Sequence, residues 1–368
     1  MSAGRCAIVG GGLAGFVTYT TLLYGGIEPE EITVFATDPD PAAAWRLRAA
    51  SIGQRRMRSE SDGHCLPTSF PGLAVRAALR RRSARPLFES VCNRYHPPVD
   101  EFLAHVAELR EQTGWDRRVR LARIERVASV EGGFALDGEG VFSHVLLAPG
   151  HPGLAFPDDL VGDTRAVHAY EAHEFADDVA VVGAGMAAAT EWLNALAAGA
   201  RVVSVRRREP ERRPLNVPRS LFSRRGLLHF HATSPAGRAD LLARLLAPSY
   251  PPGRHWDEPL EHAARGGRFR VDARVDGEPQ VICATGFRRG YCHDPLLSRL
   301  VDEHRLATHA DWIVLAPDST VPALTNEERT LAVAGVAAQW AYPAADTLVG
   351  MKYSARSFLG RMTACRTR

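Results

Sequence analysis

The stretch Arg5–Tyr24, RCAIVGGGLAGFVTYTTLLY, decides the fold expected of this chain of 368 residues. A short β-branched run leads into the hexad GGGLAG at Gly10–Gly15, and a helical pattern follows. In a strand, turn and helix context, G-x-G-x-x-G predicts a dinucleotide-binding turn. Gly10 permits the tight turn, Gly12 lets a pyrophosphate approach the backbone, and Gly15 lets the helix pack on the strand. The N–H groups of the helix N-terminus would hold the anion.

The second strand, Glu31–Phe35, ends where such a site places an acid on the adenosine ribose. Here the first acid after the strand is Asp38, which we take as the ribose-binding candidate. A plain turn built by Asp38 with Pro39 and Asp40 is an equal alternative. Ala14, inside the hexad, is also predicted to contact the nucleotide.

A second fingerprint lies in the middle of the chain. The run Val179–Val182 leads into GAGMAA at Gly183–Ala188, and a helix through Leu196 and the strand Arg201–Val205 follow. This is G-x-G-x-x-A in the same context. The cofactor-binding candidates of this turn are Gly183, Gly185, Met186 and Ala187.

Arginines stand at the end of the second site, where an NAD site would place an acid. Arg206, Arg207 and Arg208 follow the strand directly. A planar guanidinium matches phosphate oxygens bidentately, so Arg206 and Arg207 are predicted to bind a 2′-phosphate and NADPH is favoured over NADH. A solvated basic loop is the alternative.

Two dinucleotide sites in one chain imply two cofactors that exchange electrons. A second nicotinamide would be redundant, so the N-terminal site is predicted to hold FAD. Strand-like runs at 119–130, 133–137 and 141–148, separated by glycine turns, predict a small antiparallel meander. The last run leads into Gly150, another candidate for cofactor contact. The expected class is α/β, with two Rossmann-like domains of three layers.

Composition excludes several other classes. The formal net charge is only +3, which gives no basic face long enough to track nucleic acid. Lys352 is the only lysine, and the other basic residues are arginine. The six cysteines form no C-x-x-C pair, which argues against zinc and a dithiol centre. No apolar run reaches the length of a membrane span, so we expect no membrane partner. We also expect a cytoplasmic protein and, from the scattered cysteines, no bound metal. Pairing of two copies is the default expectation.

The chain resembles the class B flavin monooxygenases, which include flavin-containing monooxygenases, amine N-hydroxylases and Baeyer–Villiger enzymes. The resemblance rests on GGGLAG, on GAGMAA, on ATGF at Ala284–Phe287, and on GDTRAVHAY at Gly162–Tyr170. The last segment is a loosened form of the class fingerprint, because it lacks the leading Phe and has extra residues before its His. This difference leaves the oxygen-activating subclass open.

The resemblance implies a discontinuous FAD domain. Its first part would span 1–155 and its second part 280–368, with an NADPH domain at 156–279 between them. The ATGF segment would be the strand that returns the chain to the FAD domain, with Gly286 at the cofactor. Separately from the resemblance, the length of the excursion near 210–267 predicts a substrate-facing lid, with aromatic and histidine side chains such as Phe222, Phe230 and Tyr250. A merely structural insertion is the alternative.

Further site residues follow from the same resemblance. The stretch from Trp45 to Pro67 would run along the flavin, with Trp45, Gln54 and Met57 as contacts. Gln54, Arg58 and Ser59 are the candidate catalytic residues. The alternative for Arg58 is that it is a surface arginine without a catalytic role. A relay of Asp62 and His64, or a polar turn there, is left open.

The C-terminal part would supply the other flavin contacts. Thr330–Gly335 is predicted to be a strand, and Asp346 to cap a helix over 347–362. Because Val336 replaces the family's acid, contacts to the ribityl chain and the pyrimidine edge are assigned to Gln339, Asp346 and Thr347.

The resemblance implies an FAD- and NADPH-dependent monooxygenase that transfers one oxygen atom of O2 to a small molecule through a C4a-peroxyflavin, with N-hydroxylation slightly preferred. A flavin reductase that passes electrons to a partner is one alternative. A flavoprotein with structural FAD that assists a non-redox rearrangement or cyclisation is another.

Overall fold

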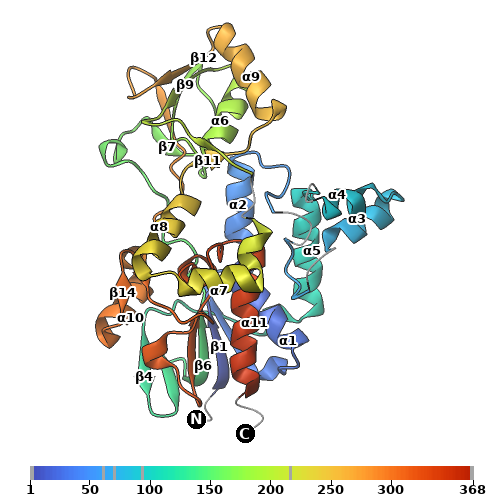
Figure 1. The fold of residues 1–368 in the computed structure, drawn as a ribbon, viewed down its shortest axis with the longest axis vertical. Helices are drawn as coiled ribbons and strands as arrows, with labels where there is room; N and C mark the ends of the chain where they lie inside the picture. The colour runs from blue at the N-terminus through green and yellow to red at the C-terminus, as the bar shows by residue number, and fades with distance from the viewer. Residues whose placement is uncertain (1–3, 60–62, 69–71, 93–94, 215–217, 365–368) are drawn as a thin grey trace.

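The structure, a computed structural model, describes residues 4–59, 63–68, 72–92, 95–214 and 218–364. Its strands form two main sheets, one mixed and one parallel, which lie one above the other in Figure 1. The large sheet has the order β3-β2-β1-β6-β5-β4, and β16 also pairs with β6. Its strands are β1 (Gly4–Val9), β2 (Ile32–Ala36), β3 (Val119–Leu121), β4 (Val127–Val130), β5 (Gly133–Leu136), β6 (Val141–Leu147) and β16 (Thr330–Val333).

The large sheet is the middle of three layers, because helices cover both of its faces. Successive side chains of a strand point to opposite faces and so belong to different cores. Ile8 of β1 belongs to a core shared with helix α1 and helix α11, whereas its neighbours Ala7 and Val9 belong to the opposite core. The first face is covered by α1 (Leu13–Tyr24), α5 (Val99–Gln112) and α11 (Leu348–Ala364). The opposite face is covered by α7 (Arg224–Ala232), α8 (Pro235–Leu245) and α10 (Pro295–His304).

The small sheet has the order β12-β9-β8-β13-β7, with every pair parallel. Its strands are β7 (Ala166–His168), β8 (Asp178–Val182), β9 (Arg201–Val205), β12 (Phe269–Asp272) and β13 (Gln280–Cys283). Helices α6 (Met186–Ala197) and α9 (Arg254–Arg265) pack on one face. Leu160 and Phe156, from the connection that enters this part, cover the other. The expected α/β class with two Rossmann-like sheets is confirmed.

Two strand predictions need correction. The run 119–130 is not one strand: β3 joins β2 in parallel, and only β4, β5 and β6 form the antiparallel meander. A β-branched run shows strand propensity but not which partner it pairs with. The ATGF segment is not a strand either, because β13 ends at Cys283 and residues 284–287 connect the two parts.

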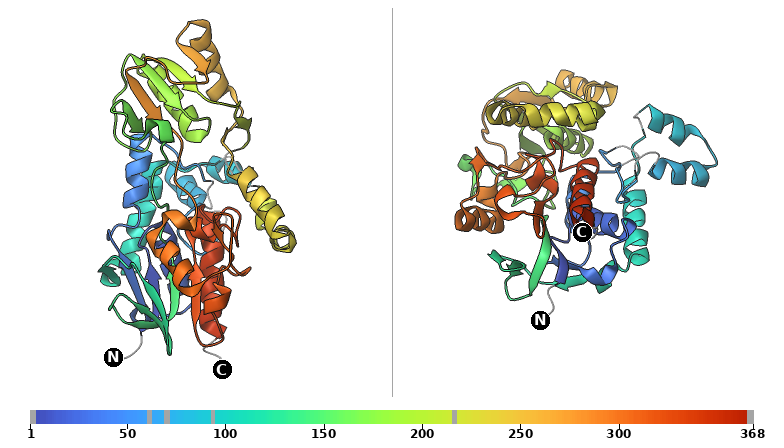
Figure 2. Two further views of the ribbon diagram at one scale, coloured as in Figure 1. Left: turned by 90° about the vertical axis from the view of Figure 1, so that its left-hand side faces the viewer. Right: turned by 60° about the horizontal axis from the view of Figure 1, so that its bottom comes forward.

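Helices outside the two sheets give the molecule its outline. Helix α2 (Ala43–Ser51) reaches from the large part toward the small one. Helices α3 (Leu73–Arg81) and α4 (Arg85–Val91) project to one side, as the right-hand view of Figure 2 shows. The remaining strands are β10 (Glu211–Arg212) paired with β11 (Ser249–Tyr250), and β14 (Thr308–His309) paired with β15 (Trp312–Ile313).

A buried ion pair stabilises the small part next to its contact with α2. His173 Nε2 lies 3.1 Å from Glu191 Oε2, and both side chains are buried. The amide of Asn194 on α6 donates to Ile52 O at 3.0 Å, just beyond the end of α2. The hydrogen bond to Glu191 raises the pKa of His173 above its ordinary value.

We predict that Glu191→Ala lowers the free energy of unfolding by about 3–5 kcal/mol, because it leaves a charge buried without its partner. Because the pKa of His173 is higher in the folded state, its contribution is complete below about pH 6.5 and is lost as pH rises through the folded pKa. Chemical denaturation between pH 5 and 9 should show this loss in the wild type and not in His173→Gln. An unchanged pH dependence in His173→Gln would contradict the assignment.

Candidate functional site

The carboxyl ends of four parallel strands, β2, β1, β6 and β16, meet at one edge of the large sheet. Gly10 N donates to Phe35 O at 2.8 Å, Ala148 N to Val9 O at 2.7 Å, and Ala334 N to Leu147 O at 2.8 Å. From β1, the chain passes through α1 to β2 on one side, while β6 lies on the other side. This is the topological switch point of an open α/β sheet, where such folds bind ligands.

The first glycine turn leaves room for a ligand at one position only. Gly10 has φ +113°, and a Cβ there would lie 2.1 Å from Ala148 O; a Cβ on Gly15 would lie 2.0 Å from Gly10 O. At Gly12 no atom lies within 4 Å of the Cβ position. Gly12 precedes α1 without a side-chain cap, and the first turn carries no acid. The unsatisfied N–H groups of this turn therefore face a position that an anion fits.

The second turn repeats this geometry at the carboxyl end of β8. Gly183 has φ +136°, and a Cβ there would lie 2.6 Å from Ala284 O. Gly185 precedes α6 without a side-chain cap. A Cβ added to Gly185 would have Pro248 Cα, 3.9 Å away, as its nearest neighbour. Met186 and Ala187 are the first two residues of α6. An open hollow of about 420 Å³ beside β7 lies at the amino ends of these strands, away from the turn.

Asp38 lies beside the first turn. Its carboxylate accepts from Asp40 N at 2.8 Å, which is the turn that the sequence allows. Its backbone is also close to the glycines, because a Cβ on Gly11 would lie 3.5 Å from Asp38 O. The ribose role of Asp38 stays a prediction.

The three arginines after β9 differ in their surroundings. Arg206 is mostly buried, pairs with Glu209 at 2.9 Å, and lies 5.4 Å from the centre of the Trp192 ring. Arg207 and Arg208 are exposed, and no ion pair within the described residues includes either of them. A phosphate would therefore compete with Glu209 for Arg206 but not for the other two.

Helix α2 and the residues after it are fixed against α5. Trp45 packs edge-on against Phe102, with ring centres 5.1 Å apart. Gln54 Nε2 donates to Arg56 O at 2.9 Å, so part of its amide holds its own segment. Met57 is buried, and its N–H donates to Pro97 O at 2.7 Å.

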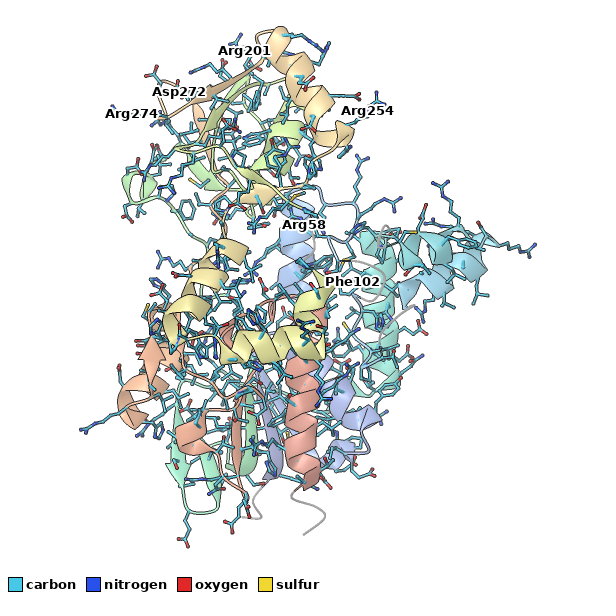
Figure 3. The ribbon with its side chains drawn as sticks, in the orientation of Figure 1. Arg58, Phe102, Arg201, Arg254, Asp272 and Arg274 are labelled. Atoms are coloured by element: carbon cyan, nitrogen blue, oxygen red, sulfur yellow. The ribbon has the colours of Figure 1, made fainter. Side chains whose placement is uncertain are left out.

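The other candidates of this segment follow α2 along the chain. Figure 3 shows Arg58 beyond the end of α2, between the large and the small part. Arg58 and Ser59 are partly exposed, and the ring of His96 contacts Ser59 O at 3.3 Å. His64 is buried, but Asp62 lies outside the described residues, so the relay stays a prediction.

The C-terminal candidates lie between β16 and α11. Gln339 is fully buried, and its side-chain amide interacts with the carboxyl group of Asp346. Burial raises the pKa of Asp346. The predicted cap at Asp346 is wrong, because α11 begins at Leu348 and Thr347 Oγ1 accepts from Gly350 N at 3.1 Å. Threonine and aspartate are both good capping residues, so sequence alone does not separate them.

Lys352 connects α11 to the segment that precedes α3. It is buried, and its ammonium donates to Thr68 O at 3.0 Å. A compact ammonium fits where a guanidinium would need more room, which is a physical reason for a lysine here.

The two connections between the sheets meet in a stack of rings that sequence reasoning missed. The His151 ring stacks on Phe287 at 4.1 Å, and Tyr170 stacks on Phe287 at 4.9 Å. The guanidinium of Arg48 lies 4.6 Å from the centre of the Phe287 ring. Gly150 and Gly286 lie in the same connections at φ +80° and +78°, with open space at their Cβ positions. Tyr170 and Phe287 stood out as motif residues, but no signal in the sequence predicted their contact.

The excursion near 210–267 contributes packing on both parts. Phe230 belongs to the core of the large part, and Tyr250 to that of the small part. Phe222 stacks on Tyr353 at 5.0 Å, and His231 Nε2 contacts Ala341 O at 2.8 Å. Phe230 and Tyr250 are therefore packing residues, which corrects their expected place on a substrate-facing surface.

The described residues hold no group of three or more His, Cys, Asp or Glu side chains that could bind a metal ion. Within the same part of the chain, no helix is both long and apolar enough to cross a membrane.

The glycine geometry predicts that one alanine substitution affects stability and that another affects cofactor binding. Gly10→Ala should lower the free energy of unfolding by about 3 kcal/mol or more, because its Cβ would clash with Ala148 O and its φ is positive. Gly12→Ala should leave the stability of the cofactor-free protein unchanged, and it should reduce FAD binding because its Cβ fills the open position. Denaturation midpoints and flavin content per chain measure the two effects. Equal flavin content in Gly12→Ala and wild type would refute the cofactor assignment of this turn.

Comparison with known proteins supports the fold. No protein-family model matches the chain, and no curated protein sequence does. Among solved structures, ornithine hydroxylase PvdA from Pseudomonas aeruginosa is similar at 15% identity and a TM-score of 0.70, over 97% of this chain and 99% of that one. The ornithine N-hydroxylase of Kutzneria sp. 744, in a structure with reduced FAD, NADP+ and L-ornithine, is similar at 13% identity and a TM-score of 0.75, over the whole of both chains.

A third similar structure has another activity. Bacillithiol disulfide reductase Bdr from Bacillus cereus is 15% identical, with a TM-score of 0.62, over 99% of each chain. The chain therefore has the fold of the flavin monooxygenases with two Rossmann-like sheets, which the bacillithiol disulfide reductase shares.

Proposed function

We propose that the protein is an FAD- and NADPH-dependent monooxygenase, which inserts one oxygen atom of O2 into a small-molecule substrate and prefers N-hydroxylation. The observation that carries the proposal is the pair of glycine turns, each with an uncapped helix N-terminus behind it. The similarity to two ornithine hydroxylases over nearly all of each chain supports this choice. The proposal includes a cytoplasmic location.

FAD fits the large part. Its pyrophosphate would lie against Gly12 and the first turn of α1, where the Cβ position is open and no side chain caps the helix. The buried amide of Gln339, which lies beside the carboxyl group of Asp346, would meet the polar edge of the flavin or its ribityl chain. The positive N-terminus of α11 would favour the negative charge of the reduced ring.

NADPH fits the small part. Its pyrophosphate would lie against Gly185 at the start of α6, and its 2′-phosphate against Arg207 and Arg208, with Arg206 exchanging Glu209 for the phosphate. The domain division that goes with this assignment is 1–155 and 280–368 for FAD, and 156–279 for NADPH.

The bound flavin would supply the electron transfer and the oxygen chemistry. The protein's own residues orient the two nucleotides and exclude water. Burial keeps His151 uncharged at neutral pH, because it and the nearby Arg48 and Arg289 lower the pKa of this residue to about 4. The ring stack of His151, Phe287 and Tyr170 therefore places an uncharged imidazole where the two connections meet.

A reductase that acts on disulfides is the second candidate, because Bdr has the same fold. Thiol exchange needs an accessible thiolate. Cys65 and Cys283 are buried, and burial raises their pKa to about 12 and about 11; Cys6 is buried as well, with a raised pKa. The exposed Cys92 and Cys292 form no disulfide with another described cysteine. The cysteine environments therefore favour the monooxygenase.

Oxygen and NADPH consumption by the FAD-loaded protein tests the function directly. We expect the addition of a suitable amine to increase both rates equally, with hydroxylated product formed in proportion. A panel of amines, ketones and thioethers covers the reaction types of the class. NADPH oxidation that needs an artificial acceptor and does not respond to any of these compounds would favour the reductase, and negligible oxidation would favour structural FAD.

The choice of nicotinamide nucleotide has its own test. Arg207→Ala with Arg208→Ala should raise the KM for NADPH by about tenfold or more and leave the KM for NADH nearly unchanged, because only NADPH carries the 2′-phosphate. Arg254→Ala, on α9, is the matched control for loss of an exposed arginine. Equal effects on both nucleotides would contradict the assignment.

A further inference from the structure

Two half-buried arginines near the ring stack lack the carboxylate partners that Arg165 and Arg201 have. Arg165 pairs with Asp163 at 2.8 Å, and Arg201 pairs with Asp178 through two oxygens. The side chains of Arg48 and Arg289 make no hydrogen bond or ion pair with any described residue, although both are half-buried. Burial lowers the pKa of each. Asp346 acts on Arg289 electrostatically but forms no ion pair with it, so both guanidinium groups keep N–H donors that an anionic ligand could use.

The available donors are defined by the contacts that these residues do make. The guanidinium carbon of Arg48 lies 4.6 Å from the centre of the Phe287 ring, and its N–H groups donate to no described residue. One terminal nitrogen of Arg289, Nη1, is buried without a partner within the described residues. His151, which both guanidinium groups influence, presents a buried Nδ1 that also lacks one. Three polar groups from separate segments are therefore close together.

The position of this group follows from the two glycine turns. His151 comes three residues after Ala148, whose carbonyl abuts Gly10, and Phe287 comes three residues after Ala284, whose carbonyl abuts Gly183. The contact of His151 with Phe287 thus connects the ends of the two turns. Arg289 also lies within electrostatic range of Asp346, at the start of α11. A ligand here would lie between the two nucleotides.

We propose that Arg48 and Arg289, with His151, form an oxyanion-binding site between the two nucleotide sites. The ligand group is a carboxylate or a phosphate, held by charge-assisted hydrogen bonds from the two guanidinium groups. It has two possible sources, a carboxylate of the organic substrate or a phosphate of NADPH. The proposal rests on the proposed function only for the identity of these two ligands.

Calorimetric titration of the FAD-loaded protein tests the site without any need for turnover. The variants are Arg48→Gln and Arg289→Gln, with Arg254→Gln as the matched control; Figure 3 shows Arg254 on α9, far from α2. The probes are NADP+, adenosine 2′,5′-bisphosphate, and amino acids paired with their decarboxylated amines, such as L-ornithine with putrescine, at saturating NADP+. Loss of one charge-assisted contact should weaken binding by about tenfold or more.

A phosphate source predicts weaker binding of NADP+ in both variants, with unchanged binding of adenosine 2′,5′-bisphosphate, which lacks the nicotinamide half. A carboxylate source predicts unchanged NADP+ binding, tighter wild-type binding of an amino acid than of its amine, and loss of that preference in the variants. Arg289→Lys should recover part of the affinity because it restores the charge. If Arg48→Gln does not fold, Arg289→Gln alone decides.

The proposal is overturned if NADP+ binds wild type and variants alike and wild type shows no preference for any carboxylated probe. Because these are binding measurements, absence of oxygen consumption would contradict the proposed function and leave this result intact.

Discussion

The close approach of Gly10 to the carbonyl of Ala148 is the contact on which the rest of the structure depends. A Cβ at Gly10 would lie 2.1 Å from that oxygen, so β1 can turn into α1 beside β6 only if the residue is glycine. The same approach occurs between Gly183 and Ala284 in the small sheet. Each contact fixes a helix N-terminus at the carboxyl edge of its sheet, and each is followed by a connection that leads to the other sheet.

The two connections explain how two nucleotide folds become one site. His151 and Phe287 stack where the connections meet, and Tyr170 and Arg48 join them from the small and the large part. The excursion through α7 and α8 adds a second link, because Phe230 packs in the core of the large part. Relative placement of the two sheets is thus set by packing, and the unpaired arginines lie at the place where reactants would meet.

Local features of the fold could be predicted from the sequence, because glycine turns and hydrophobic periodicity are local signals. The strand Arg201–Val205 has the predicted bounds. Features that depend on distant partners could not be predicted. The run 119–130 forms two strands that pair with different neighbours, and Thr347 replaces Asp346 as the helix cap. Arg48 contacts Phe287, a residue that is distant in the sequence. In the candidate site, the sequence predicted both glycine turns, but it did not predict the ring stack.

The central claim is that one chain holds two different dinucleotides at the same time. Native mass spectrometry of the protein after incubation with FAD and NADP+ measures this most directly. The account predicts a species with one FAD and one NADP+ per chain, with NADP+ bound to the FAD-loaded form without displacing FAD. Displacement of one nucleotide by the other, or binding of only one per chain at saturation of both, would contradict it.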